Sequence, residues 1–310
     1  MYTEPKYSIV IPVFNSSTSL IELSEQLLLF FKKIPFEIIF IDDGSTNPLT
    51  WHTIESLSNI HPYISGTRFR KNFGKPSALL CGFQEAQGKY IITMDDDLQH
   101  HPEELSKLIS QQEHDVVIGL FPKKKHSLLK RILSKIKNRI EVWAYQKPKS
   151  ITVSPFKLIR KEVISDILKI KSNKPFIASL LFAVTHDVVN VSVLHKKRKY
   201  DSSGFTFIKM SQTLTNLLFN NSSILLQLVA VLGVFLSTIC LGITVYLLFE
   251  KILRGNTINE STVLMLTTSI IGGVLLFATG VIGEYLIRII SGVEKRPAYF
   301  VSKKTRNLNS

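Results

Sequence analysis

The sequence predicts an α/β domain with a Rossmann-like, mostly parallel sheet, followed by a juxtamembrane helix and a C-terminal hairpin of two transmembrane helices. Apolar, β-branched runs recur along the first part of the chain, and stretches with helical spacing separate them. Strands that are apolar throughout and alternate with helices are typical of a parallel sheet covered on both faces. Two long segments without formal charge lie near the C-terminus and predict the hairpin.

The expected strands are the runs YSIVIPVF at 7–14, FEIIFID at 36–42, ISGTRF at 64–69, YIITMD at 90–95 and DVVIGL at 115–120. The expected helices occupy 20–32, 48–57, 75–86, 103–112 and 128–145. The polar clusters PVFNSS, DDGST and DDDLQ follow the first, second and fourth strands. Because ligands of parallel sheets bind beyond the carboxyl ends of the strands, these clusters predict one shared site.

The three adjacent aspartates in DDDLQ predict a divalent metal site. Because side chains alternate along a strand, Asp95 and Asp97 are expected on one side and Asp96 on the other, structural or solvated. Two carboxylates and the amide oxygen of Gln99 make an oxygen-rich site that suits Mg²⁺ or Mn²⁺ on a diphosphate. The two histidines that follow are interpreted as solvated, with metal ligation as the alternative.

Positive charge is concentrated in one segment of the chain. The formal net charge is +14, and residues 121–174 contain sixteen Lys or Arg against three acidic residues. Such a patch favours phosphate-containing partners: nucleic acid, anionic lipid or a phosphorylated substrate, with a solvated helical surface as the alternative. Neither a P-loop motif nor a Gly-x-Gly-x-x-Gly motif occurs in the sequence. The cysteines, Cys81 and Cys240, supply neither a disulfide framework nor a zinc site.

The uncharged segments 224–249 and 263–283 each exceed the ~20 residues that a helix needs to cross a bilayer. Their outer flanks are basic, whereas the connector 250–262 has balanced charge. The positive-inside rule then places both flanks in the cytoplasm. With no signal-peptide pattern at the N-terminus, the α/β domain and both termini are expected on the cytoplasmic side of the plasma membrane.

This organisation predicts four parts. They are a cytosolic domain at 1–203, a juxtamembrane amphipathic helix at 204–223, the transmembrane hairpin at 224–283 and a basic cytosolic tail at 284–310. A domain held against the bilayer makes lipid phosphate, rather than nucleic acid, the expected partner of the basic segment.

Four segments together resemble family 2 glycosyltransferases of the polyprenyl-phosphate branch. They are SIVIPVFN, FIDDGST, RFRKNFGKPSALLCGFQEAQGKYIITMDDDLQHHPEEL and GEYLIRIISGVEKRPAYFV, and the resemblance covers nearly the whole chain. It implies a GT-A fold. It also implies metal-dependent transfer of a sugar from a nucleotide donor to a polyprenyl phosphate such as undecaprenyl phosphate, with inversion at the anomeric carbon, for modification of cell-envelope glycans.

The resemblance also implies roles for individual residues. Those implied to bind the nucleotide are Pro12, Phe14, Asn15, Asp42, Asp43 and Asp95. Those implied to bind the metal are Asp95, Asp97 and Gln99. Those implied to hold the acceptor phosphate are Lys130, Arg131, Ser134, Arg139 and Arg198. The catalytic set is Asp95, Asp97 and Arg131.

The sequence departs from the family pattern at three places. Ser16 replaces an acidic residue, DSSGFTF replaces a Gly-x-Ser-Lys/Arg pattern, and Ile151 stands where members usually carry an Asp proposed as catalytic base. A phosphomonoester with a second pKa near ~6 is already a nucleophilic dianion at neutral pH. Positioning and charge neutralisation can exceed the ~10²–10⁴-fold that a general base contributes, so transfer is expected without that Asp.

Two alternatives stay open. A processive polysaccharide synthase typically carries Gln-x-x-Arg-Trp, whereas neither Trp51 nor Trp143 follows an arginine and two spans are few for a channel. A catalytically silent, nucleotide-binding membrane scaffold would account for Ile151. The bacterial-type hairpin favours a UDP-sugar donor, and the resemblance leaves a homo-oligomer, in the form of a tetramer, as an open expectation.

Overall fold

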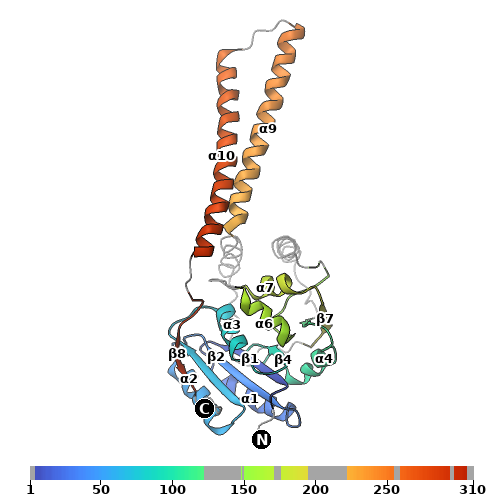
Figure 1. The fold of residues 1–310 in the computed structure, drawn as a ribbon, viewed down its shortest axis with the longest axis vertical. Coiled ribbons are helices and arrows are strands. Elements are labelled where there is room, and N and C mark those ends of the chain that lie inside the picture. Colours follow the sequence, from blue (N-terminus) through green and yellow to red (C-terminus); the bar gives the residue numbers. More distant parts are fainter. Residues whose placement is uncertain are drawn as a thin grey trace. The chain divides into compact units, whose positions relative to one another are not determined.

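The computed structural model describes residues 4–121, 148, 150–170, 176–194, 222–254, 259–293 and 297–305. The chain divides into two compact units, one formed by Met1–Ser203 with Arg296–Ser310 and the other by Gly204–Lys295 (Figure 1). The expected acceptor residues Lys130, Arg131, Ser134, Arg139 and Arg198 lie outside the described residues. So do the expected helix at 128–145 and residues 204–221 of the expected juxtamembrane helix.

The first unit is built on a mixed, mostly parallel sheet that confirms the predicted α/β class. Within the described residues its strand order is β7-β5-β6-β4-β1-β2-β3-β8. The strands are β1 (Tyr7–Val13), β2 (Phe36–Asp42), β3 (Ile64–Phe69), β4 (Tyr90–Thr93), β5 (Val116–Leu120), β6 (Lys157–Arg160), β7 (Val188–Ser192) and β8 (Val301–Lys304). β1 pairs in parallel with both β2 and β4, whereas β6 runs antiparallel to β4 and β5.

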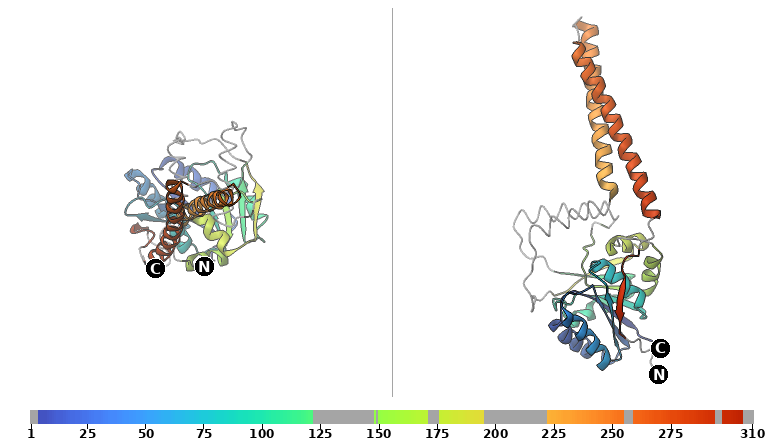
Figure 2. Two further views of the ribbon diagram at one scale, coloured as in Figure 1. Left: turned by 90° about the horizontal axis from the view of Figure 1, so that it is seen from above. Right: turned by 90° about the vertical axis from the view of Figure 1, so that its left-hand side faces the viewer.

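Helices cover both faces of this sheet. They are α1 (Thr18–Phe30), α2 (Pro48–Ile60), α3 (Lys75–Glu85), the 3₁₀ helix η1 (Pro102–Glu104), α4 (Leu105–Ile109), α6 (Lys161–Lys169) and α7 (Ile177–Val184). α1 contacts α2 on one side, and α3, α6 and α7 pack together on the other (Figures 1 and 2). The helix expected at 103–112 is shorter than predicted and begins as η1.

Burial on both faces explains why β1 and β2 are apolar almost throughout. Every residue of β1 is buried, and all of β2 is buried except Glu37. α3 lies close against β1, because a Cβ added at Gly82 would meet the Val10 side chain at 2.2 Å. Asn47 starts α2 by accepting a hydrogen bond from the Leu49 N–H, with Pro48 at the first helical position.

The C-terminal segment differs from the basic tail expected at 284–310. Residues up to Val293 belong to a helix, and Val301–Lys304 forms β8, which runs antiparallel to β3 at the edge of the sheet. An unpaired edge strand exposes a row of N–H and C=O groups, and β8 satisfies those of β3. Of this segment, Arg296–Ser310 is part of the first unit (Figure 2), whereas the residues before it belong to the second.

The second unit contains two long helices, α9 (Ser222–Arg254) and α10 (Glu260–Val293), which pack along each other (Figure 1). A Cβ at Gly273 would lie 2.0 Å from the Ser237 hydroxyl oxygen, so the two backbones approach closely there. Within the described residues, Glu260–Gly283 is long and apolar enough to cross a membrane. The other expected span, 224–249, contains a shorter apolar helical stretch, Val231–Leu247.

Candidate active site at the carboxyl ends of the strands

A cavity of about 450 Å³ lies beyond the carboxyl ends of β1, β2 and β4. The loops that follow these three strands bring the polar clusters together there, as the strand order predicts. The lining residues are Pro12, Val13, Phe14, Asn15, Ser16, Ser17, Thr18, Ser19, Asp43, Lys75, Asp95, Asp96 and Asp97. Six of the predicted site residues are among them, and their roles in binding stay predictions.

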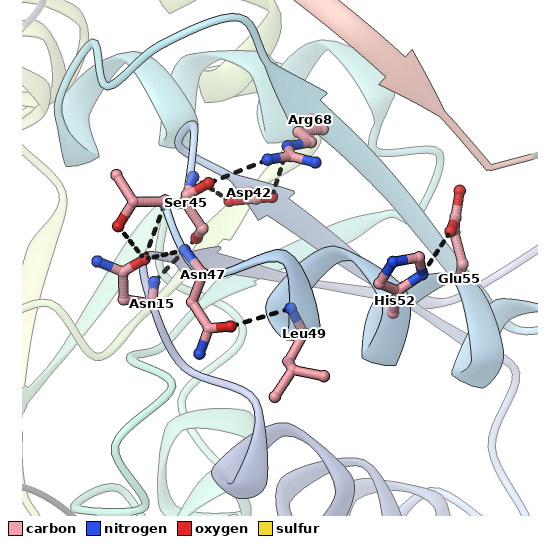
Figure 3. A network of polar contacts seen from close by, with 9 residues as sticks. Asn15, Asp42, Ser45, Asn47, Leu49, His52, Glu55 and Arg68 are labelled. Carbon is pink, nitrogen blue, oxygen red and sulfur yellow. Dashed lines mark hydrogen bonds and ion pairs between the residues drawn. The ribbon is translucent and has the colours of Figure 1, made fainter.

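Asn15 joins the loop after β1 to the loop after β2 (Figure 3). Its backbone has a positive φ of 57°, which asparagine tolerates better than most residues. The side-chain Oδ1 accepts hydrogen bonds from the backbone N–H groups of Thr46 at 2.9 Å and Asn47 at 3.1 Å. The Asn15 N–H donates to the Ser45 hydroxyl at 2.9 Å. Asn15 therefore fixes the shape of this wall of the cavity.

Asp42 supports the same loop from behind (Figure 3). It is fully buried; Oδ1 accepts from the Ser45 N–H at 2.8 Å, and Oδ2 lies 3.3 Å from Nε of Arg68. Arg68 also donates to the Ser45 carbonyl at 3.0 Å. Among the described residues the cavity lining includes Asp43 but not Asp42. The contact between Asp42 and a nucleotide stays a prediction, whereas its bracing contacts are observed.

Asp43 lines the cavity and receives two backbone hydrogen bonds. Its carboxylate accepts from the N–H of Phe73 at 2.7 Å and of Gly74 at 2.9 Å. Burial raises the pKa of Asp43, and these two hydrogen bonds oppose that rise. The next residue, Gly44, has φ 67°, and a Cβ there would lie 2.3 Å from the carbonyl carbon of Lys71. Only glycine fits at this position of the DDGST motif.

The three aspartates do not alternate as predicted. β4 ends at Thr93, before the acidic cluster begins, so the alternation of a strand does not extend to these residues. Asp95, Asp96 and Asp97 all line the cavity, and the prediction that Asp96 points away is wrong. Burial raises the pKa of Asp96 to about 6; the neighbouring aspartates add to the rise, and hydrogen bonding with Ser16 opposes it.

Lys75 brings a cation to this acidic wall. Its ammonium forms an ion pair with the Asp95 carboxylate, and Lys75 itself lines the cavity. Lys75 is the first residue of α3, in the KNFGKP segment directly after β3. Lys75 lies outside the polar clusters that predicted the site, because the loop after β3 contains basic and apolar residues but no acidic ones.

A second lysine lies behind the same aspartate. Lys157 of β6 is only 4% exposed and pairs in the sheet with Thr93. The pKa of Lys157 is lowered to about 8, mainly by burial and also by the charge of Lys75, while Asp95 opposes both. A lysine inside the apolar run SPFKLI was the available sequence signal, and it was not recognised.

The histidine that follows Gln99 is part of the core. His100 is 3% exposed, its ring stacks on Phe156 at a centroid distance of 5.0 Å and an angle of 5°, and Nδ1 accepts from the Asp95 N–H at 3.3 Å. The interpretation of this residue as solvated is wrong. Gln99 donates its backbone N–H to Asp97 Oδ1 at 3.1 Å, and its role as a metal ligand stays a prediction.

The donor atoms of the cavity fit a divalent cation. Among the described residues no set of three or more His, Cys, Asp or Glu side chains already converges in metal-binding geometry. Nevertheless, three adjacent carboxylates face one cavity, and the raised pKa of Asp96 reflects both burial and their mutual repulsion. Carboxylate oxygens are the ligands that Mg²⁺ and Mn²⁺ prefer.

Ile151, at the position expected for a catalytic base, is buried and apolar. Its N–H donates to the Pro148 carbonyl at 3.1 Å, and its side chain can neither accept nor release a proton. The residue that departs from the family pattern is therefore an ordinary buried residue of the core.

Comparison with known proteins places this geometry in context. Residues 8–168 match the model of a protein family described as glycosyl transferase family 2. The undecaprenyl-phosphate 4-deoxy-4-formamido-L-arabinose transferase of Pectobacterium atrosepticum is 30% identical over 307 residues, covering 96% of this chain and 92% of that protein. The Proteus mirabilis protein of the same name is 28% identical over 305 residues, covering 96% and 93%.

Solved structures show the same fold in the first unit. Glucosyl-3-phosphoglycerate synthase from Mycobacterium tuberculosis, in complex with Mn²⁺, UDP-glucose and phosphoglyceric acid, superposes with a TM-score of 0.52 at 14% identity. The match covers 70% of this chain and 80% of that one. At this identity the likeness concerns the fold alone, and it supports the GT-A-like architecture expected from the sequence.

Proposed function

Because the chain belongs to glycosyl transferase family 2, we propose that it transfers a sugar from a nucleotide-sugar donor to undecaprenyl phosphate or a closely related polyprenyl phosphate. The observation that carries the proposal is the acidic cavity at the strand ends, which lies within the matched region. Similarity to undecaprenyl-phosphate sugar transferases along 96% of the chain supports the choice of acceptor.

In this proposal the donor nucleotide binds between the loop fixed by Asn15 and the carboxylate of Asp43. Asp95 and Asp97 hold a Mg²⁺ or Mn²⁺ ion, with Asp96 beside them in the same wall. When bound, the ion neutralises charge that develops on the leaving diphosphate. Lys75 supplies a positive charge from the chain itself at the same wall.

The acceptor side of the proposal rests on the basic segment. Lys130, Arg131, Ser134, Arg139 and Arg198 would orient the lipid phosphate, whose oxygen attacks the anomeric carbon opposite the nucleotide, with inversion. Since Ile151 offers no base, the phosphate dianion itself acts as the nucleophile. Correct placement of the two reactants is then the main contribution of the protein to the rate.

The two apolar helices supply the attachment to the membrane in this proposal. Glu260–Gly283 would be one span, and the segment 224–249, which includes Val231–Leu247, would be the other. Both ends of this hairpin carry basic flanks, which supports a cytoplasmic position for the catalytic unit. A polyprenyl phosphate has its phosphate at the membrane surface, where a tethered domain can reach it.

The test is a screen of nucleotide sugars, UDP-sugars first, with the full-length protein in membranes that contain undecaprenyl phosphate. Mass spectrometry of the lipid fraction is expected to show a lipid-linked monosaccharide, with Mg²⁺ or Mn²⁺ required. A polymeric product would instead identify a processive synthase.

A catalytically silent scaffold is the second candidate, and the buried Ile151 is the observation that favours it. Calorimetry with UDP and Mn²⁺ distinguishes the two: binding without any lipid-linked product in the screen would favour the scaffold.

A further inference from the structure

We infer that residues 297–305, which we call the C-terminal strap, hold the loop 70–74 in the conformation that shapes the donor site. Tyr299 and Phe300 are the positioning residues of this strap. The inference rests on the proposed function for the identity of the donor. The coupling between strap and loop is a property of the fold, so that part of the inference is independent of the proposed function.

The strap is fixed to the edge of the sheet along its length. Within β8, Lys304 pairs with Thr67 and Val301 with Phe69 of β3. At its end, the Thr305 hydroxyl accepts from the Gly66 N–H at 2.9 Å, and the Thr305 N–H donates to the Gly66 carbonyl at 2.9 Å. These backbone bonds give the strap a defined register on β3.

The first residues of the strap contact the loop after β3. The Phe300 carbonyl accepts from the Arg70 N–H at 2.9 Å. The Tyr299 ring stacks on Phe69 at a centroid distance of 4.7 Å and an angle of 12°. Phe73 lies against both aromatic neighbours, 5.9 Å from Phe69 and 6.0 Å from Phe300. Aromatic rings from two segments that are far apart in the sequence thus form one cluster at the loop.

The loop in turn forms part of the site. Phe73 and Gly74 donate the two hydrogen bonds that hold the Asp43 carboxylate, and Lys75 follows directly with its ion pair to Asp95. Gly74 has φ 93°, a conformation that glycine adopts readily and other residues rarely do. Phe73 therefore contacts the strap through Phe300 and contacts the cavity lining through Asp43.

The strap also contacts the far end of the helix that starts at Lys75. The Tyr299 hydroxyl donates to Gln84, and Lys304 forms an ion pair with Glu85, both near the end of α3. The start of α3 is held through the loop and its end is held directly. The strap therefore contacts the end of α3, whereas it reaches the start of α3 only through the loop 70–74.

Tyr299→Ala in the full-length protein tests the inference by hydrogen–deuterium exchange without any ligand. Loss of the stacked ring is expected to raise the exchange rates of the Phe73 and Gly74 amides about two- to tenfold. The affinity for UDP with Mn²⁺ should fall by a similar factor. Tyr299→Phe keeps the ring and is expected to restore both values.

Lys304→Ala is the matched control. It removes a contact of the same strap with α3, but Lys304 is not part of the aromatic cluster of Phe69, Phe73, Tyr299 and Phe300, so neither value should change. If Tyr299→Ala misfolds, Phe300→Ala replaces it, because the Phe300 side chain is 52% exposed and its loss leaves the backbone bond to Arg70 intact.

Unchanged exchange at Phe73 and Gly74 in Tyr299→Ala would overturn the inference. An equal rise in Lys304→Ala would also overturn it, because it would indicate general loosening of the edge of the sheet. If UDP fails to bind even the wild-type protein, the proposed donor is wrong, and the exchange rates still decide the role of the strap.

Discussion

Lys75 and Asp95 form an ion pair on the wall of the acidic cavity, twenty residues apart along the chain. The pair links the first residue of α3 to the cluster after β4, so one of the three aspartates already has a cation of the protein beside it. A metal ion on Asp95 would have to share this carboxylate with Lys75 or displace its ammonium. This relationship leads to the first prediction.

Lys75→Met is expected to tighten the binding of Mn²⁺ alone and to weaken the binding of UDP. Removal of the ammonium leaves Asp95 fully available to the metal but takes one positive charge from the phosphate site. Because the pair is partly exposed, about two- to fivefold is expected for each change. Titration of Mn²⁺ followed by electron paramagnetic resonance measures the first, and calorimetry with UDP the second.

Lys71→Met serves as the control for this experiment. The Lys71 ammonium lies over the Phe73 ring at 5.3 Å, in the same loop but outside the cavity lining. An identical effect of both substitutions would mean that the net charge of the loop matters, and not the contact with Asp95.

Asp97→Ala is expected to abolish sugar transfer, with a loss of at least about 10²-fold, because it removes a carboxylate from the cavity wall. Transfer of labelled sugar to undecaprenyl phosphate in membranes measures the effect. Asp166→Ala is the control, since Asp166 pairs with Lys169 on the surface of α6. Transfer by Asp97→Ala at the wild-type rate would contradict the metal role.

Lys157→Met is expected to stabilise the protein at pH 7 while lowering its activity. In the folded protein the pKa of Lys157 is lowered to about 8 from an ordinary 10.5, so burial of the charged amine costs free energy below pH 8. The wild type regains this free energy as the pH rises from about 8 to 10.5, where the folded state holds a neutral amine. The substitution should therefore raise Tm at pH 7 and raise it less at pH 10.

Lys157→Met is expected to increase the free energy of unfolding at pH 7 by about 1–3 kcal/mol, because each unit of pKa shift corresponds to about 1.4 kcal/mol. Thermal unfolding at the two pH values provides the measurement. Lys169→Met on the exposed face of α6 is the matched control and should give the same Tm as the wild type at both. If Lys157→Met raises Tm equally at both pH values, better packing, and not removal of the buried charge, is the cause.

Gly273→Ala is expected to disturb the packing of α9 against α10. The added Cβ would lie 2.0 Å from the Ser237 hydroxyl oxygen and 2.8 Å from the Gly233 carbonyl oxygen. Overpacking of this kind costs about 1–3 kcal/mol. Gly272→Ala, one residue away, meets nothing within 4 Å and is the control. Thermal stability in detergent should fall for the first variant only.

The strands of the first half of the chain could be predicted closely. β1, β2 and β3 lie within a residue of their expected bounds. For β1 and β2 the reason is that burial on both faces requires apolar side chains almost throughout, whereas β3 is only partly apolar. The position of the site followed from the same reasoning. Three polar clusters at parallel strand ends must meet at one edge of the sheet, and they line one cavity.

The errors concern contacts between residues that are distant in sequence. His100 is buried because Phe121 and Phe156 stack on its ring, and no local pattern places those residues beside it. The orientation of Asp96 depends on where β4 ends, and a difference of two residues reverses the prediction. β8 was missed because a short, charged segment becomes a strand only through its pairing with β3.

The pairing of β8 with β3 has a consequence for the synthesis of the protein. The ribosome makes β3 early and β8 much later, after both apolar helices have been translated. Until then the edge of β3 has no partner, and an open edge invites pairing with other chains. A nascent chain, or one that stops before residue 301, therefore lacks one edge strand of this sheet. In the cell, an open β3 edge would mark a chain in which β8 has not yet been translated.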